Sequence, residues 1–332
     1  MLPVIGITLG DPASIGPEII LKTLAVRRPF YDHCRPLVIG DQRVLAQTAH
    51  HLGISVVFNV VTNLSETRGE PGIIDVMDLQ NADPATFAPG QVSGIAGKAA
   101  AEYIVRGTEL ALAGDIAAIV TAPINKEAIN LGGYHYAGHT ELLADLTHAT
   151  DVSMMLVSSK LRVLHVSTHV ALSEAITRVK TARVLKVIRM ADQACKMLGI
   201  QAPRVAVAGL NPHAGESGLF GNQEIEEITP AIEAARAEGI DASGPWPGDT
   251  VFLQAVKGKF DAVIAMYHDQ GHIPMKLLGF DEGVNVSIGL PIIRTSVDHG
   301  TAFDIVGQGI ASETSLIAAI DVAVQMVAAR SA

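Results

Sequence analysis

The chain has 332 residues, of which 48% are hydrophobic and 4% aromatic, and its formal net charge at pH 7 is -10. Binding to a phosphate backbone demands clustered Lys and Arg, so this acidic balance argues against a nucleic-acid partner. No stretch reaches the roughly 18 uninterrupted apolar residues that span a bilayer, and the N-terminus lacks a basic segment followed by a cleavage site. We therefore expect a cytoplasmic protein with no membrane partner.

Short runs rich in Val and Ile alternate with helical patterns along the chain. These apolar runs lie at 4–10, 36–40, 117–123, 153–158, 162–168, 204–210, 261–267 and 285–290. Between them, apolar residues at three- and four-residue steps predict helices at 15–26, 94–114, 181–199, 225–239 and 312–330. Strands that alternate with helices predict an α/β fold with a parallel or mixed sheet. Because no long linker interrupts the pattern, any two domains should be interleaved.

Three histidines each follow a predicted strand, and they are His169, His213 and His268. Because the carboxyl ends of strands converge in α/β folds, these side chains can meet. Three neutral imidazoles with an open fourth position form a divalent-metal site of the zinc or cobalt type. The alternative is three unrelated polar residues on loop tips, since a lone histidine usually binds no ligand. His165 and His272 compete for the same role.

Side chains near the ends of other predicted elements suggest recognition of an anion. Arg294 offers bidentate contacts to phosphate and Lys276 a point charge, and Asn285 lies between them in the sequence. This trio suits a phosphorylated small acid, although an isolated Lys or Arg more often forms a surface salt bridge. His139 and Thr140 precede a helix and could orient substrate hydroxyl and carboxylate groups, or Thr140 could be only an N-cap.

Two further segments carry weaker signals. Asp249 in GPWPGDTVF is equally typical of a helix N-cap and of a catalytic carboxylate. The loop 298–314 is punctuated by glycines, which permit close approach of the backbone to a ligand. Its candidate cofactor-binding residues are Gly300, Asp304 and Gly307. Neither a Gly-x-Gly-x-x-Gly nor a Walker signature occurs, so a nicotinamide site would use another scaffold.

Taken together, the motifs resemble those of the 4-hydroxythreonine-4-phosphate dehydrogenase family of pyridoxal phosphate biosynthesis. The matching segments span nearly the whole chain and are GDPASIGPE, TAPINK, GHTELLA, STH, GLNPHAGESGLFG, GPWPGDT, YHDQGHIPMK and GVNVSIGLPIIRTSVDHGTAFDI. The outline is also similar to that of the isocitrate and isopropylmalate dehydrogenases, which bind a dinucleotide without the usual fingerprint. The resemblance implies two interleaved α/β/α domains with a cleft between them, formed by 1–140 plus 300–332 and by 141–299.

Carried over by motif, the resemblance implies NAD and a divalent metal, with zinc favoured over cobalt, manganese or magnesium. The implied metal ligands are His169, His213 and His268, contributed across both subunits of a homodimer whose active site lies at the interface. The residues implied to bind a small phosphorylated acid are His139, Thr140, Lys276, Asn285 and Arg294, the last three near the phosphate. We hypothesise that Asp249 is the general base, with His139 as its relay.

Two departures from the family pattern bear on this interpretation. Ser14 stands where the family usually has glycine, and a serine there would be strained at positive φ. Biosynthetic members usually read YHDQGLxxLK, whereas this chain reads YHDQGHIPMK. The latter is closer to the branch that resembles D-threonate and D-erythronate 4-phosphate dehydrogenases.

We therefore predict oxidation of a 4-phosphorylated 3-hydroxy acid by NAD, with decarboxylation to a three-carbon ketone phosphate. Three alternatives stay open. The first is 4-hydroxythreonine-4-phosphate dehydrogenase itself, and the second is a metal-dependent lyase of sugar-acid phosphates. The third is a non-catalytic sensor of sugar phosphates.

Overall fold

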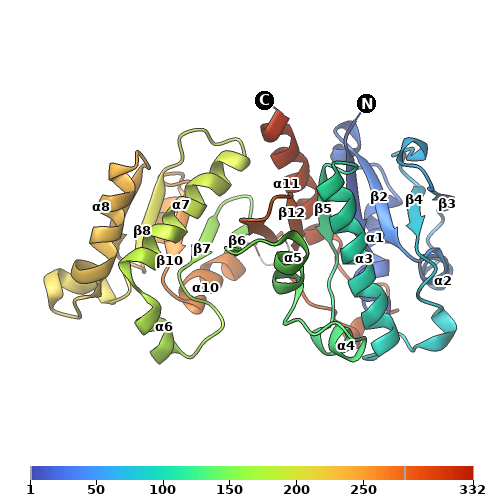
Figure 1. Cartoon of the computed structure of the whole chain (residues 1–332), viewed down its shortest axis with the longest axis horizontal. Helices are drawn as coiled ribbons and strands as arrows, with labels where there is room; N and C mark the ends of the chain where they lie inside the picture. The colour runs from blue at the N-terminus through green and yellow to red at the C-terminus, as the bar shows by residue number, and fades with distance from the viewer. Residues whose placement is uncertain (1, 280–281, 332) are drawn as a thin grey trace. The chain divides into compact units, whose positions relative to one another are not determined.

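The computed structural model describes residues 2–279 and 282–331. Its contacts divide the chain into two units, Met1–Val152 with Gly289–Ser331, and Ser153–Ile288. The first unit is therefore built from both ends of the chain, and the second unit is inserted between them. Strands and helices alternate through both units, which confirms the predicted α/β class (Figure 1).

The strands of the first unit are all parallel to their neighbours, in the order β3-β4-β2-β1-β5-β12. Their bounds are β1 Val4–Thr8, β2 Arg35–Gly40, β3 Val57–Val60, β4 Ile73–Asp78, β5 Ala118–Thr121 and β12 Arg294–Val297. All residues of β1 and β5 are buried. Such continuous apolar strands are expected where helices cover both faces of a parallel sheet.

Helices cover both faces of this first sheet. Their bounds are α1 Gly16–Leu24, α2 Gln42–Leu52, α3 Gly94–Ala113, α4 Lys126–Leu131, α5 His139–Thr147 and α11 Thr314–Ser331. Ile104 of α3, Leu142 of α5 and Ile119 of β5 share one apolar cluster. Behind it, Thr295 of β12 donates a hydrogen bond of 2.8 Å to a carbonyl of α11. Because side chains alternate along a strand, Arg294 lies on the face covered by α3 and α5.

The second unit has a mixed sheet with the order β11-β6-β7-β10-β8-β9. Its strands are β6 Ser153–Val157, β7 Arg162–His165, β8 Val205–Ala208, β9 Ala242–Trp246, β10 Ala262–Ala265 and β11 Val284–Ile288. β6 runs antiparallel to β7 and β11, whereas β7, β10, β8 and β9 are parallel. The carboxyl ends of β7, β8 and β10 therefore lie at one edge of the sheet, where the loops that carry the candidate histidines begin.

The helices of the second unit are α6 Leu172–Arg178, α7 Thr181–Met197, α8 Thr229–Ala237, α9 Val251–Val256 and α10 His268–Gly279. Two shorter helical turns of this unit are η4 Pro212–Gly218 and η5 Glu224–Ile228. Those of the first unit are η1 Pro29–Asp32, η2 Leu64–Glu66, η3 Pro84–Thr86 and η6 Phe303–Ile305. Val163 of β7, Val263 of β10 and Phe252 of α9 belong to the core of this unit. The core thus lies directly behind the strand ends that carry the histidine loops.

Ser14 does not have the positive φ that would strain a serine at this position. Its hydroxyl donates to the carbonyl of Asp11 at 2.7 Å and accepts from the amide of Gly16 at 3.0 Å. The serine therefore stabilises the turn that leads into α1.

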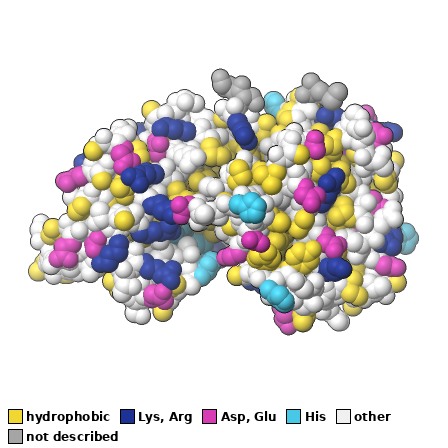
Figure 2. Space-filling model, in the orientation of Figure 1, with side chains coloured by type: hydrophobic (Ala, Val, Ile, Leu, Met, Phe, Trp, Pro, Cys, Tyr) yellow, Lys and Arg dark blue, Asp and Glu magenta, His cyan; other side chains and the backbone are white. Residues whose placement is uncertain are grey.

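Basic and acidic side chains are interspersed over the face that Figure 2 shows. Among the described residues, none of the helices combines the length and the apolarity that crossing a bilayer requires.

Candidate active site

His268 is the first residue of α10, and two residues separate it from the end of β10. Its Nδ1 lies 2.7 Å from Oδ1 of Asp269. A carboxylate on one ring nitrogen fixes the orientation of an imidazole and leaves Nε2 as the nitrogen that can bind a metal. The local geometry of His268 therefore fits the chemistry of a metal ligand.

His169 lies beside His268, with 5.6 Å between the ring centroids. The two rings line a hollow of about 520 Å³ in the second unit, together with Thr168, Leu172 and Tyr267. The loop after β7 and the start of α10 supply these residues, so the pairing follows from the adjacency of β7 and β10 in the sheet. The structure thus brings two of the three predicted metal ligands together.

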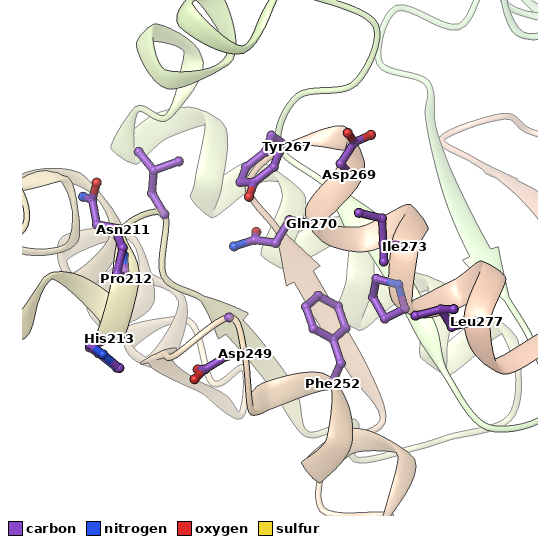
Figure 3. A pocket seen from close by; sticks show the side chains of 13 residues that line it. Asn211, Pro212, His213, Asp249, Phe252, Tyr267, Asp269, Gln270, Ile273 and Leu277 are labelled. Carbon is purple, nitrogen blue, oxygen red and sulfur yellow. The ribbon is translucent and has the colours of Figure 1, made fainter.

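His213 lines a second hollow of about 560 Å³ in the same unit. Figure 3 shows His213 and Asp249 on one side of this hollow and Tyr267 and Ile273 on the other. Tyr267 and Asp269 line both hollows, so the hollows adjoin. Among the described residues, no three His, Cys, Asp or Glu side chains are grouped so that they could hold a metal ion. One chain therefore offers a histidine pair and, next to it, a third histidine.

The loop that carries His213 has an unusual backbone. The five residues from 213 to 217 all have positive φ, between 43° and 80°, although only the middle one is glycine. A left-handed conformation costs an L-residue roughly 1–2 kcal/mol. Such strain persists where the surroundings hold it and is common at functional sites. No feature of residue type predicts this conformation, so sequence reasoning did not find it.

Two other histidines extend the group around His268, one in contact with it and one behind. The ring of His272 stacks on that of His268 with 3.7 Å between centroids and 10° between planes. His165, the last residue of β7, lies 4.7 Å from His272. Burial, with the neighbouring His272 and His268, lowers the pKa of His165 to about 3, so this ring is neutral at pH 7. A side chain at Gly271 would lie 2.2 Å from His165, which explains the glycine.

Gln270 ties the two histidine loops together. Its Oε1 accepts from the amide of Met266 at 2.6 Å, and its Nε2 donates to the carbonyl of Gly209 at 2.7 Å. Met266 follows β10 and Gly209 follows β8, so this one side chain bridges the ends of both strands. The sequence alone does not reveal this bridge, because it depends on β10 lying beside β8.

Lys276 and Asn285 belong to the second unit and occupy different elements. His268, His272 and Lys276 are spaced by four residues on α10, so they share one face of that helix. Lys276 is exposed and Asn285, on β11, is partly buried. The structure therefore aligns the predicted phosphate lysine with the candidate metal ligand along one helix.

Arg294, His139 and Thr121 form a separate cluster in the first unit. The guanidinium of Arg294 is buried and donates to Oγ1 of Thr121 at 2.6 and 3.2 Å, from Nη2 and Nε. Burial lowers the pKa of Arg294 to about 9, so it stays protonated at pH 7. The sequence did not single out Thr121, although TAPINK, which it begins, was among the matching motifs.

His139 is the first residue of α5, and its Nε2 is buried without a hydrogen-bond partner in the part of the chain that is described. Burial and the nearby Arg294 cation hold the pKa of His139 well below its usual range. The imidazole is therefore neutral at pH 7 and can accept a hydrogen bond. This cluster combines a hydrogen-bond acceptor with a buried cation that can bind an anion.

The two N-cap interpretations are wrong. α5 begins after Gly138, which makes Thr140 the second residue of the helix. α9 has Thr250 as its N-cap, so Asp249 lies outside it, exposed, in the hollow of His213.

The glycine-rich loop of the first unit is anchored on α1 and α2. Lys22 of α1 donates to two carbonyls of this loop at 2.8 Å, and His51 of α2 lies 3.0 Å from the carbonyl of Gly307. Gly307 has a φ of 77°, and a side chain at Gly300 would meet nothing within 4 Å. Asp304 belongs to the turn η6. The loop thus leaves open space at Gly300 while its far end is fixed.

Three comparisons with known proteins lead to the same family. Residues 32–323 match the family described as "Pyridoxal phosphate biosynthetic protein PdxA". The chain is 51% identical over 323 residues to a D-threonate 4-phosphate dehydrogenase of Salmonella typhimurium, covering 97% of this chain and 98% of that one. It is 50% identical over 323 residues to a 4-hydroxythreonine-4-phosphate dehydrogenase of Beijerinckia indica, covering 97% and 94%.

The crystal structure of 4-hydroxythreonine-4-phosphate dehydrogenase from Klebsiella pneumoniae is similar with a TM-score of 0.91, 46% identity and 98% coverage of both chains. Relatives whose names carry different substrates are thus about equally similar to this chain.

Proposed function

We propose that this chain, which belongs to the PdxA family of pyridoxal phosphate biosynthetic proteins, is an NAD-linked dehydrogenase of a 4-phosphorylated 3-hydroxy acid. The observation that carries the proposal is the contact environment of His139 and Arg294. A neutral imidazole beside a buried guanidinium can accept a hydrogen bond from a substrate hydroxyl while the cation binds the anionic group of the substrate. The three relatives named above carry the names of dehydrogenases of small phosphorylated substrates, which supports the same reaction class.

The proposed substrate is D-threonate 4-phosphate or D-erythronate 4-phosphate. Hydride leaves C3 for the nicotinamide and the proton of the C3 hydroxyl goes to a base. The resulting 3-keto acid loses carbon dioxide and yields a three-carbon ketone phosphate. The segment YHDQGHIPMK supports the branch of D-threonate and D-erythronate 4-phosphate dehydrogenases. In the fold, His272 of this segment stacks on His268. The alternative is 4-hydroxythreonine-4-phosphate dehydrogenase of pyridoxal 5'-phosphate biosynthesis, a name that other relatives carry.

Each side chain has a proposed role. Arg294, held by Thr121, binds the phosphate together with Lys276 and Asn285. Asp249 is the proposed general base, because it is exposed in the hollow of His213, and His139 is its proposed relay. Thr140 orients the substrate carboxylate or hydroxyl. The proposed cofactor residues are Gly300, Asp304 and Gly307.

A divalent metal is implied by the family, with zinc the first choice, and the local chemistry of His169 and His268 fits one. These two would hold the ion together with His213. When bound, a divalent ion acts as a Lewis acid that stabilises negative charge on the oxidised substrate. The carboxylate of Asp269 would keep His268 oriented for this role.

Because the described residues of one chain do not group three such ligands, we propose a homodimer in which His213 of one subunit completes the pair of the other. Exposed apolar side chains near the two hollows support such a contact surface. Leu277 is 81% exposed and Leu172 59%, and each lines one of the hollows. Large apolar side chains exposed around a site are typical of a surface that a partner covers.

The test is NAD reduction with 4-phosphohydroxy-L-threonine, D-threonate 4-phosphate and D-erythronate 4-phosphate, with carbon dioxide measured alongside. We expect NADH and carbon dioxide in equal amounts and the highest kcat/KM with one of the two acids that carry a C2 hydroxyl. Preference for the amino acid would favour the biosynthetic alternative. Cleavage of substrate without NAD would favour the lyase, and binding without turnover would favour the sensor.

A further inference from the structure

The left-handed turn from 213 to 217 requires an explanation, because four of its five residues have side chains that disfavour positive φ. Local preference does not stabilise it, so contacts from elsewhere must hold it. The turn begins at His213, directly after Asn211 and Pro212, and it precedes the π-helical turn η5. The first residue of η5 is Glu224.

Glu224 is buried, with an exposed fraction of 3%, and its carboxylate faces the start of the turn. Oε1 accepts from the amides of Leu210 and Asn211, both at 2.7 Å. Oε2 accepts from Nδ2 of Asn211 at 2.9 Å. Charge-assisted hydrogen bonds from backbone amides to a buried carboxylate are among the strongest in proteins.

The turn also closes around this carboxylate. A side chain at Gly215, in the middle of the turn, would lie 2.8 Å from Oε2, and one at Gly209 would lie 3.2 Å from Oε1. Asn211 extends the contact because its carbonyl accepts from the amide of Ala214 at 3.1 Å. Glu224 is thus in contact with the segment before His213 and close to the segment after it.

We infer that Glu224 is a positioning residue. Its carboxylate holds the left-handed turn and so directs His213 into the hollow that Asp249 and Tyr267 also line. The inference rests on the proposed function, in which His213 is a metal ligand. Residues that orient a metal ligand from behind typically contribute 10–100-fold to metal affinity.

The chain offers a matched control in Glu227, three residues later in η5. Its carboxylate accepts from the amide of Thr181 at 2.8 Å and from its hydroxyl at 2.9 Å, and it pairs with Lys180 at 2.7 Å. Glu227 therefore makes as many hydrogen bonds as Glu224, but to the start of α7 rather than to the His213 loop. Glu227→Gln should affect stability without affecting the metal.

The experiment uses the full-length protein and zinc itself as the probe. The dissociation constant for Zn²⁺ is measured by competition with a chromophoric chelator for wild type, Glu224→Gln, Glu227→Gln and Asn211→Ala, with thermal melting in parallel. We expect Glu224→Gln to weaken zinc binding by about 10–100-fold and Asn211→Ala by a smaller factor. Glu227→Gln should stay within about twofold of wild type at a similar loss of melting temperature.

The outcomes separate the inference from the proposed function. His213→Ala is measured as well, and loss of zinc affinity in it confirms His213 as a ligand. If His213→Ala loses affinity while Glu224→Gln and Asn211→Ala keep it, the inference about Glu224 is wrong and the proposed function stands. If His213→Ala keeps wild-type affinity, the proposed metal site fails and the inference fails with it. Should Glu224→Gln not fold, the result for Asn211→Ala decides.

Discussion

The first and second units present their candidate functional groups in opposite ways. In the first unit, Arg294 and His139 are desolvated, and burial lowers the pKa of both. In the second unit, His169, His268 and His213 line open hollows of several hundred Å³. Burial keeps the imidazole of His139 neutral and leaves the guanidinium of Arg294 as a cation with little access to water. Open hollows leave histidine nitrogens accessible to an ion and to another subunit.

The largest effect on activity should follow from changing the buried Arg294 of the first unit. Arg294→Lys replaces a fork that donates twice to Thr121 with a point charge that cannot reproduce both bonds. Loss of a buried, hydrogen-bonded cation contact costs about 2–5 kcal/mol, so kcat/KM should fall by about 30- to 5,000-fold, chiefly through KM.

Steady-state NAD reduction measures this change. Arg106→Lys is the matched control in the same unit, because Arg106 is partly exposed and pairs with Glu109 on the surface of α3. A wild-type KM in Arg294→Lys would contradict the role of the buried guanidinium.

The accessible histidines of the second unit are tested by changing Asp269, which contacts His268. Asp269→Asn weakens the contact that orients His268, and zinc affinity should fall by about 10–100-fold. Chelator competition measures the affinity. Asp192→Asn is the control, because it removes the charge of a carboxylate that pairs with Lys196 in the same unit. Equal zinc affinities in the two variants would mean that Asp269 does not support the site.

Desolvation in the first unit can be tested independently at Asp11. Burial raises the pKa of Asp11 from 3.8 to about 6, against a smaller opposing effect of the Ala13 amide. The folded state therefore holds the proton more tightly than the unfolded state, and stability falls as pH rises from about 4 through 6. Asp11→Asn removes this penalty, so its gain over wild type should be about 2 kcal/mol larger at pH 8 than at pH 4.5.

Urea unfolding at both pH values gives the two free energies of unfolding. Asp32→Asn, at an exposed carboxylate of the same unit, is the control. A difference between Asp11→Asn and wild type that does not change with pH would show that Asp11 is not neutralised by burial.

The smallest effect is expected at the ring that stacks on His268. His272→Leu removes a stacked aromatic contact worth about 0.5–1.5 kcal/mol, so zinc affinity should fall by roughly 2–10-fold. The same variant reports on the substrate branch, because leucine is the residue of the biosynthetic pattern. His50→Leu, on the surface of α2, is the control. An unchanged affinity would reduce His272 to a packing residue without influence on His268.

Much of the fold could be predicted because most of its strands overlap continuous apolar runs, whereas β3, β4, β9 and β12 include polar residues or Gly and Pro and were missed. β10 and β8 lie inside the predicted runs, and the histidines follow them as expected. What the sequence could not supply are contacts set by strand order. The pairing of His169 with His268 depends on β7 lying beside β10, and the hold of Thr121 on Arg294 depends on β5 lying beside β12.

The backbone around His213 was beyond sequence reasoning for a different reason. Ala214, Glu216 and Ser217 all take positive φ against their own preference, and contacts with Glu224 explain why the turn can form. The stacking of His272 likewise arises from helical geometry, since it places residues four apart on one face. Residue type alone therefore predicts neither the left-handed turn at His213 nor the stacking of His272 on His268.

The central claim is that a complete site combines histidines of two subunits, and subunit complementation tests it most directly. His213→Ala and His268→Ala are each expected to be inactive. When the two variants are mixed, dissociated and reassembled, each mixed dimer has one intact site, so about a quarter of wild-type activity should return. If all three ligands came from one chain, both sites of the mixed dimer would be defective. The absence of any regained activity in verified mixed dimers would contradict the account.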